Sequence, residues 1–188
     1  MDGGKSLLVC KAVDEGARLC DLFDALTENT IYVFVNRNPI AILDGWMRRG
    51  LSVRDASKRF VTITKLQLDA LASRADVWCL PFDSVLETPF AAARRIYRHS
   101  NNQANALTQL KLKVKPILRS NNEYGMPIDS VDQKMIITHE NVRDLIDPNI
   151  SEIQIGHVSP RDQAIFLDIS GRMIEKLDAF VSQHQMPD

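Results

Sequence analysis

A long amphipathic segment near the C-terminus constrains the fold of this chain more than any other feature. Between residues 160 and 184 the apolar side chains recur every three or four residues, which is the spacing of one face of an α-helix. This stripe comprises Ile165, Phe166, Ile169, Met173, Ile174, Leu177, Phe180 and Val181. Ser159, Pro160 and Asp162 precede it and suit the N-cap, N1 and N3 positions of a helix. We therefore expect a long final helix whose apolar face serves the core or a dimer interface.

The first half of the chain predicts a small sheet. Residues 30–35 form the strongest predicted strand, since every side chain there is β-branched or aromatic. Residues 6–13 and 77–80 are further strand candidates, and residues 40–43 follow an Asn-Arg-Asn-Pro turn as a hairpin partner. An amphipathic helix is expected after the first of these strands.

The second half of the chain is predicted to be mainly helical. Residues 90–99 and 101–114 have helical propensity, and a short helix is expected to follow Thr138. Residues 135–137 predict a short strand, and the alternation in residues 150–158 predicts a half-buried one. The fold class that follows is α+β or mixed α/β, with a small sheet in the N-terminal half and a helix-rich C-terminal half. A Pro-containing turn divides residues 1–82 from residues 83–188, although both could form a single domain.

The charge is segregated along the chain, although the net charge is only −1. Residues 43–121 hold fourteen Lys or Arg against six Asp or Glu, whereas residues 122–188 hold five against twelve. Residues 88–122 contain no acidic side chain at all. Clustered cations next to phosphates release condensed counterions, so this central region favours binding to a polyanion.

The candidate phosphate-binding residues lie mainly in this central region. Arg94, Arg95 and Arg98 fall on adjoining parts of one predicted helix, because residues three and four apart share a face. Tyr97 is placed to stack on a base. The remaining cations of the region are Lys111, Lys113, Lys115 and Arg119. We expect nucleic acid as the partner, and DNA rather than RNA.

Residues 51–74 resemble a helix-turn-helix, with Val53, Ala56 and Phe60 facing inward. The turn departs from that pattern, since Val-Thr-Ile stands where a glycine is usual. The resemblance implies that Lys65, Gln67 and Ser73 or Arg74 enter the major groove. It also implies phosphate contacts from Arg54, Lys58 and Arg59. Two ordinary helices in a mixed domain are the alternative interpretation.

A metal-dependent nuclease is the first alternative function. Asp129, Asp132 and Lys134 are similar to the carboxylate-x-lysine arrangement of such enzymes, in which carboxylates hold Mg²⁺. His157, at the end of a predicted strand, is similar to the first histidine of an HNH nuclease. Mg²⁺ would be needed only in that case, and we otherwise expect no cofactor. Whether the chain is an enzyme stays open.

A protein-interaction or structural subunit is the second alternative. Its basic middle and acidic C-terminal third would meet in a homo-oligomer. The three cysteines form no C-x-x-C pair and are expected to be buried thiols. No apolar run is long enough for a membrane span and no signal peptide is apparent, so we expect a cytoplasmic protein without a membrane partner.

Overall fold

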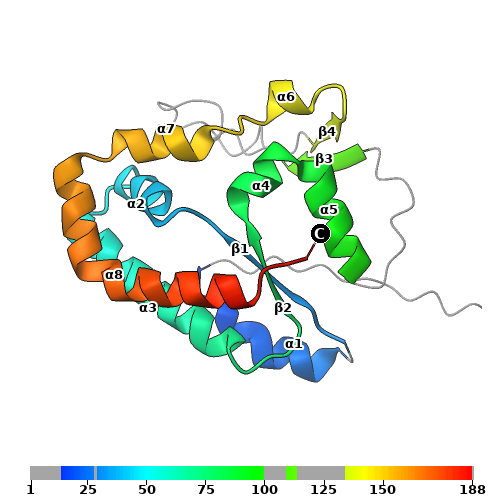
Figure 1. The fold of residues 1–188 in the computed structure, drawn as a ribbon, viewed down its shortest axis with the longest axis horizontal. Helices are drawn as coiled ribbons and strands as arrows, with labels where there is room; N and C mark the ends of the chain where they lie inside the picture. Colours follow the sequence, from blue (N-terminus) through cyan, green and yellow to red (C-terminus); the bar gives the residue numbers. More distant parts are fainter. Residues whose placement is uncertain (1–13, 28, 100–108, 114–133, 188) are drawn as a thin grey trace, which may run out of the picture. The chain divides into compact units, whose positions relative to one another are not determined.

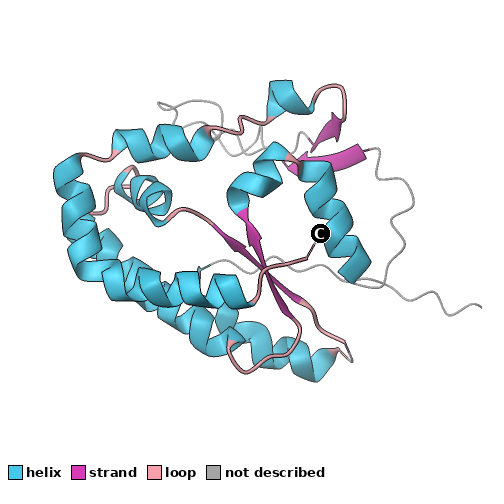
Figure 2. Ribbon diagram, viewed as in Figure 1, coloured by secondary structure: helices cyan, strands magenta, loops and turns pink. Residues whose placement is uncertain are grey.

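The computed structural model describes residues 14–27, 29–99, 109–113 and 134–187. Helices make up most of the described chain, together with two pairs of short strands (Figure 2). The chain divides into two compact units: residues 1–80 with 152–186, and residues 81–151 with the last two residues. The final helix therefore belongs with the first 80 residues and not with residues 81–151.

The elements follow one another along the chain as labelled in Figure 1. Up to residue 81 they are the 3-10 helix η1 (Asp14–Leu19), α1 (Cys20–Leu26), β1 (Tyr32–Asn36), α2 (Pro39–Met47), α3 (Val53–Leu71) and β2 (Val77–Pro81). They continue with α4 (Phe82–Glu87), α5 (Pro89–His99), β3 (Gln109–Lys113), β4 (Lys134–Thr138), α6 (Val142–Leu145), α7 (Ile150–His157) and α8 (Pro160–Gln183).

The core of the first unit lies between α3 and α8, which run side by side (Figure 1). Phe60 and Phe166 are both almost fully buried, and their ring centroids lie 5.3 Å apart in an edge-to-face arrangement. Leu43 and Trp46 of α2 join the same cluster. Burial of these large side chains is the main force that holds the helices together.

A two-stranded sheet, β1 with β2, completes the first unit. The C-terminal tail adds to its edge, because the amide of Cys79 donates to the carbonyl of His184 at 2.7 Å and the amide of Met186 donates to Cys79 at 3.0 Å. Cys20 and Cys79 are buried free thiols, as expected, and burial raises the pKa of Cys79 to about 11.

In the second unit, β3 pairs antiparallel with β4, and Leu110 stands opposite Ile137. The Ile137 side chain is buried. Phe90 of α5 stacks on His139, which follows β4, at a centroid distance of 3.9 Å. The hydroxyl of Ser151 donates to the carboxylate of Asp83 at 2.6 Å.

The predicted fold class is confirmed, including the small N-terminal sheet and the long final helix. The predicted strands at 30–35, 77–80 and 135–137 are confirmed as β1, β2 and β4, and the helix at 90–99 as α5. Residues 6–13 lie outside the described residues.

Three local predictions are wrong. Residues 40–43 belong to helix α2, because Pro39 occupies its first turn and the Asn38 side chain caps it by accepting from the amide of Ile40 at 2.9 Å. Residues 109–113 are a strand where a helix was expected. Residues 150–157 form helix α7 and not a strand.

No helix in the part of the chain that the structure describes combines the length and the apolar character needed to cross a membrane.

Candidate nucleic-acid interface

Within the segment that resembles a helix-turn-helix, residues 51–74, α3 is a single helix of 19 residues that continues through the predicted turn. The predicted turn at Val61, Thr62 and Ile63 is therefore wrong. Ile63 is buried beside Phe60 in the core, and burial outweighs the weak helical propensity of β-branched residues. The hydroxyl of Thr62 donates to the carbonyl of Lys58 one turn earlier, which satisfies it inside the helix.

The start of α3 is fixed by its N-cap. The Ser52 hydroxyl accepts a hydrogen bond from the amide of Asp55 at 3.2 Å and donates to the Asp55 carboxylate at 2.6 Å. The predicted inward positions Ala56 and Phe60 are buried, and Val53 is half-buried. One face of α3 is thus committed to the core, which leaves the opposite face to solvent.

Three cations form a row on this exposed face, and we call Arg54, Lys58 and Lys65 the α3 row. All three side chains are exposed. At 3.6 residues per turn they lie within about 40° of one another around the helix axis and span about 16 Å along it. None of the three makes an ion pair with another described residue. The row is therefore a positive edge on a rigid helix, with one exposed acidic residue, Asp69, a turn after Lys65 at its end.

Arg59 follows Lys58 in the sequence, lies about 100° from it around the helix axis and is also exposed. Its guanidinium is placed over the ring of Trp46, 5.7 Å from the ring centroid. Trp46 is buried, with 8% of its surface accessible. Arg59 therefore belongs to the edge of the core as well as to the basic surface.

In the second unit, α5 carries the other basic candidates. Arg94 and Arg98 are exposed and one turn apart, and we call them the α5 pair. Arg95 and Tyr97 are half-buried, and each has an interaction partner in the structure. Phe90 and Ala92 anchor the helix through burial. The structure thus brings Arg94 and Arg98 together on the surface but not Arg95.

The remaining predicted cations are only partly covered by the structure. Lys111 and Lys113 lie on β3, where the backbone of Lys113 pairs with that of Lys134. Lys115 and Arg119 lie outside the described residues.

Arg74, which the helix-turn-helix resemblance placed in a groove, has a structural role. Its guanidinium pairs with Asp24 at 2.8 Å and with Asp21 at 2.5 Å, and only 12% of its side chain is exposed. It also lies over the ring of Tyr32, 5.3 Å from the centroid. Arg74 therefore ties the segment after α3 to α1 and β1, and its guanidinium is engaged within the protein.

The hydroxyl of Tyr32 donates to Asp24 at 2.6 Å within the same network. This hydrogen bond, together with the Arg74 guanidinium, holds the pKa of Asp24 below its usual value. Burial and the bond to Asp24 raise the pKa of Tyr32 to about 12. Sequence reasoning missed this network because its members are distant along the chain.

The predicted nuclease residues do not come together in the described structure. Asp129 and Asp132 lie outside the described residues, and Lys134 is the first residue of β4. His157 ends helix α7, so its predicted place at a strand end is wrong. Its Nδ1 lies 3.7 Å from Oδ1 of the buried Asp44, which also pairs with Arg48 at 2.5 Å. Within the described ranges, no group of three or more potential metal ligands is present.

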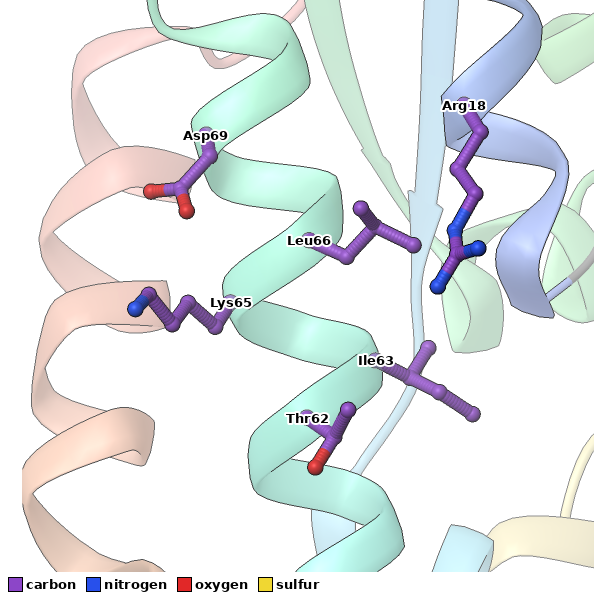
Figure 3. A pocket seen from close by; sticks show the side chains of 6 residues that line it. All are labelled: Arg18, Thr62, Ile63, Lys65, Leu66 and Asp69. Carbon is purple, nitrogen blue, oxygen red and sulfur yellow. The ribbon is translucent and has the colours of Figure 1, made fainter.

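A shallow hollow of about 250 Å³ lies between η1 and α3 (Figure 3). It is lined by Arg18, Thr62, Ile63, Lys65, Leu66 and Asp69. Figure 3 shows Arg18 reaching from η1 toward Leu66 and Ile63, whereas Lys65 and Asp69 extend from another side of α3. Charges of both signs line the hollow, so it does not extend the basic surface as a site for anions.

No protein-family model matches the chain, and no curated protein matches it. Among solved structures, a sulfotransferase domain from the curacin biosynthetic pathway is similar, with 12% sequence identity and a TM-score of 0.49. The match covers 82% of this chain but only 58% of that domain. A similarity at this level assigns neither the fold nor the activity of that domain to the chain.

Proposed function

We propose that this chain is a cytoplasmic protein that binds nucleic acid, DNA rather than RNA, through phosphate contacts. The observation that carries the proposal is the α3 row, in which Arg54, Lys58 and Lys65 share one exposed face without an ion pair to another described residue. Cations in such a position gain most from phosphates, because binding releases the counterions condensed on the nucleic acid.

The charge of the neighbouring helix supports this interpretation over that of an ordinary solvated face. Helix α8 packs beside α3 in the same unit and carries three cations and four acidic residues along its length. On α3 four cations stand against two acids, and one of these, Asp55, is engaged in the N-cap. The positive charge is thus local to α3 and is not a general property of the unit.

The α5 pair is a second contact point in the proposal. Pro89–His99 contains three arginines and no acid, and Arg94 and Arg98 are exposed one turn apart. Phosphate contacts position a protein on a duplex without reading its sequence, and a helix that presents Arg is suited to that role.

The test compares two triple variants that remove the same charge from two helices of one unit. Arg54→Ala/Lys58→Ala/Lys65→Ala removes the α3 row. Arg161→Ala/Arg172→Ala/Lys176→Ala removes three exposed cations from α8. We expect the first variant to lose roughly tenfold or more in affinity for labelled duplex DNA at low salt, and the second to change little.

Equal losses in the two variants would contradict a specific role for the α3 row. If the wild-type protein binds no nucleic acid at low salt but self-associates in a salt-sensitive way, the proposal is wrong and the oligomeric subunit is favoured. Circular dichroism of both variants checks that each one folds.

A further inference from the structure

We infer that the nucleic acid bound at the α3 row is a duplex, held through its phosphates. This inference rests on the proposed function and specifies its substrate class. Three features of the described residues support it: the rigidity of the row, the burial of the aromatic rings and the internal hydrogen bond of Thr62.

The row is fixed in place by the core behind it. Phe60 and Ile63 are buried on the opposite face of α3, where they pack in the cluster shared with α8. The cations therefore stand on a rigid edge about 16 Å long, by the rise of a helix. A duplex is itself rigid and carries one charge per about 1.7 Å of its axis, so several phosphates meet such an edge at once. A flexible single strand must first be ordered, at an entropic cost.

The Phe, Tyr and Trp rings of the described residues are covered, fully or in part, by other parts of the protein. Proteins that bind single strands generally stack bases on accessible aromatic rings. Here Trp46 is buried and has the guanidinium of Arg59 over its ring. Phe60 packs on Phe166. Every Phe, Tyr and Trp side chain in the described ranges is buried or half-buried, including Tyr97, the predicted stacking residue.

The hydroxyl beside the row is already bonded within the helix. Thr62 lies between Lys58 and Lys65 in the sequence, and its hydroxyl donates to the carbonyl of Lys58. The row itself thus offers cations and no hydroxyl or amide group to a ligand, and the exposed Asp69 lies one turn beyond Lys65. Charge alone attracts phosphates and does not distinguish one base sequence from another.

The experiment measures the affinity of the full chain for three labelled probes by fluorescence anisotropy at low salt. The probes are a DNA duplex, one of its strands alone, and a second duplex of the same composition with a shuffled sequence. We expect the single strand to bind roughly tenfold more weakly than the duplex, because it is ordered on binding and no ring stacks its bases. The affinities for the two duplexes should agree within about twofold, because phosphate contacts do not depend on the base sequence.

A second arm tests Tyr97 directly. Tyr97→Leu removes the ring, and Tyr97→Phe keeps it as the matched control. We expect neither variant to change the affinity for the single strand by more than about twofold, whereas loss of a stacked base would cost tenfold or more.

Single-strand binding as tight as duplex binding would overturn the inference, and so would a tenfold loss in Tyr97→Leu alone. In either case the proposed function would stand with a different substrate. Absence of binding to all three probes would contradict the proposed function itself, so the two failures are distinguishable.

Discussion

The guanidinium of Arg59 lies over the indole ring of Trp46, 5.7 Å from its centroid, and joins the exposed surface of α3 to a buried ring of α2. Trp46 belongs to the same core cluster as Phe60. An exposed cation thus covers the edge of the core. Substitution of Arg59 is therefore expected to change both the charge of the surface and the stability of the unit.

Arg59→Ala should lower the free energy of unfolding by about 1 kcal/mol, since it removes both the cation–π contact and the packing of the arginine stem. Arg54→Ala, also exposed on α3, is the control and should change it by less than about 0.5 kcal/mol. Urea denaturation followed by Trp fluorescence measures both. Equal effects of the two substitutions would show that the contact with Trp46 contributes nothing.

Phe60→Ala should lower the free energy of unfolding by about 3 to 5 kcal/mol, because it leaves a cavity in the core between α3 and α8. The edge-to-face contact with Phe166 adds a coupling of about 1 kcal/mol between the two sites. A double-mutant cycle with Phe166→Ala measures it. Strict additivity of the two substitutions would contradict the direct contact of the rings.

Asp24→Asn should lower the melting temperature at neutral pH and have a smaller effect in acid. The pKa of Asp24 is lowered in the folded protein, first by the hydrogen bond from Tyr32. Its carboxylate therefore stabilises the fold above its unfolded pKa of about 3.9, and this contribution is lost as the pH falls through the folded pKa. Melting curves across this range measure the difference from wild type, with the exposed Asp168→Asn as the control. A difference that stays constant with pH would contradict the network.

Ser52→Ala and Ser159→Ala should each lower the free energy of unfolding by about 1 kcal/mol. Each hydroxyl caps one of the two helices that form the core, by accepting from the amide of Asp55 or of Asp162. Gly in place of either serine should cost only a few tenths of a kcal/mol, since Gly is tolerated at an N-cap. Chemical denaturation of the four variants checks this order.

Long periodic segments were predictable from the sequence because their pattern and their environment agree. The stripe of α8 and the β-branched run of β1 each point to one structure, and the structure contains both. The N-cap of α8 was predictable as well, since the Ser159 hydroxyl forms hydrogen bonds with Asp162 as the sequence indicated. In such segments the local sequence pattern is sufficient to predict the secondary structure.

Tertiary contacts decided the segments that were predicted wrongly. The alternation in residues 150–158 indicates a strand, but Gln154 is buried on α7 with a hydrogen bond from Arg37, while Ile153 is exposed. Ile63 is buried in the hydrophobic core, and the helix that carries it continues where a turn was expected. The partners of Gln154 and Ile63 lie far away in the sequence, so no local pattern reveals them.

The sequence predicted the types of residue in the candidate site, but it did not predict which individual cations face solvent. The helix-turn-helix resemblance indicated Arg54 and Lys58, and charge segregation indicated Arg94; all three are exposed. The same resemblance also indicated Arg74, which is held by two aspartates. Only the fold separates a cation with a carboxylate partner from one that faces solvent.

The salt dependence of duplex DNA binding tests the central claim most directly. Each phosphate contact contributes about 0.9 to the slope of log K against log salt concentration, so Arg54→Ala/Lys58→Ala/Lys65→Ala should reduce that slope by about 2 to 3 relative to wild type. The α8 variant Arg161→Ala/Arg172→Ala/Lys176→Ala should keep the wild-type slope. An unchanged slope in the α3 variant, or an equal reduction in both, would contradict phosphate binding by the α3 row.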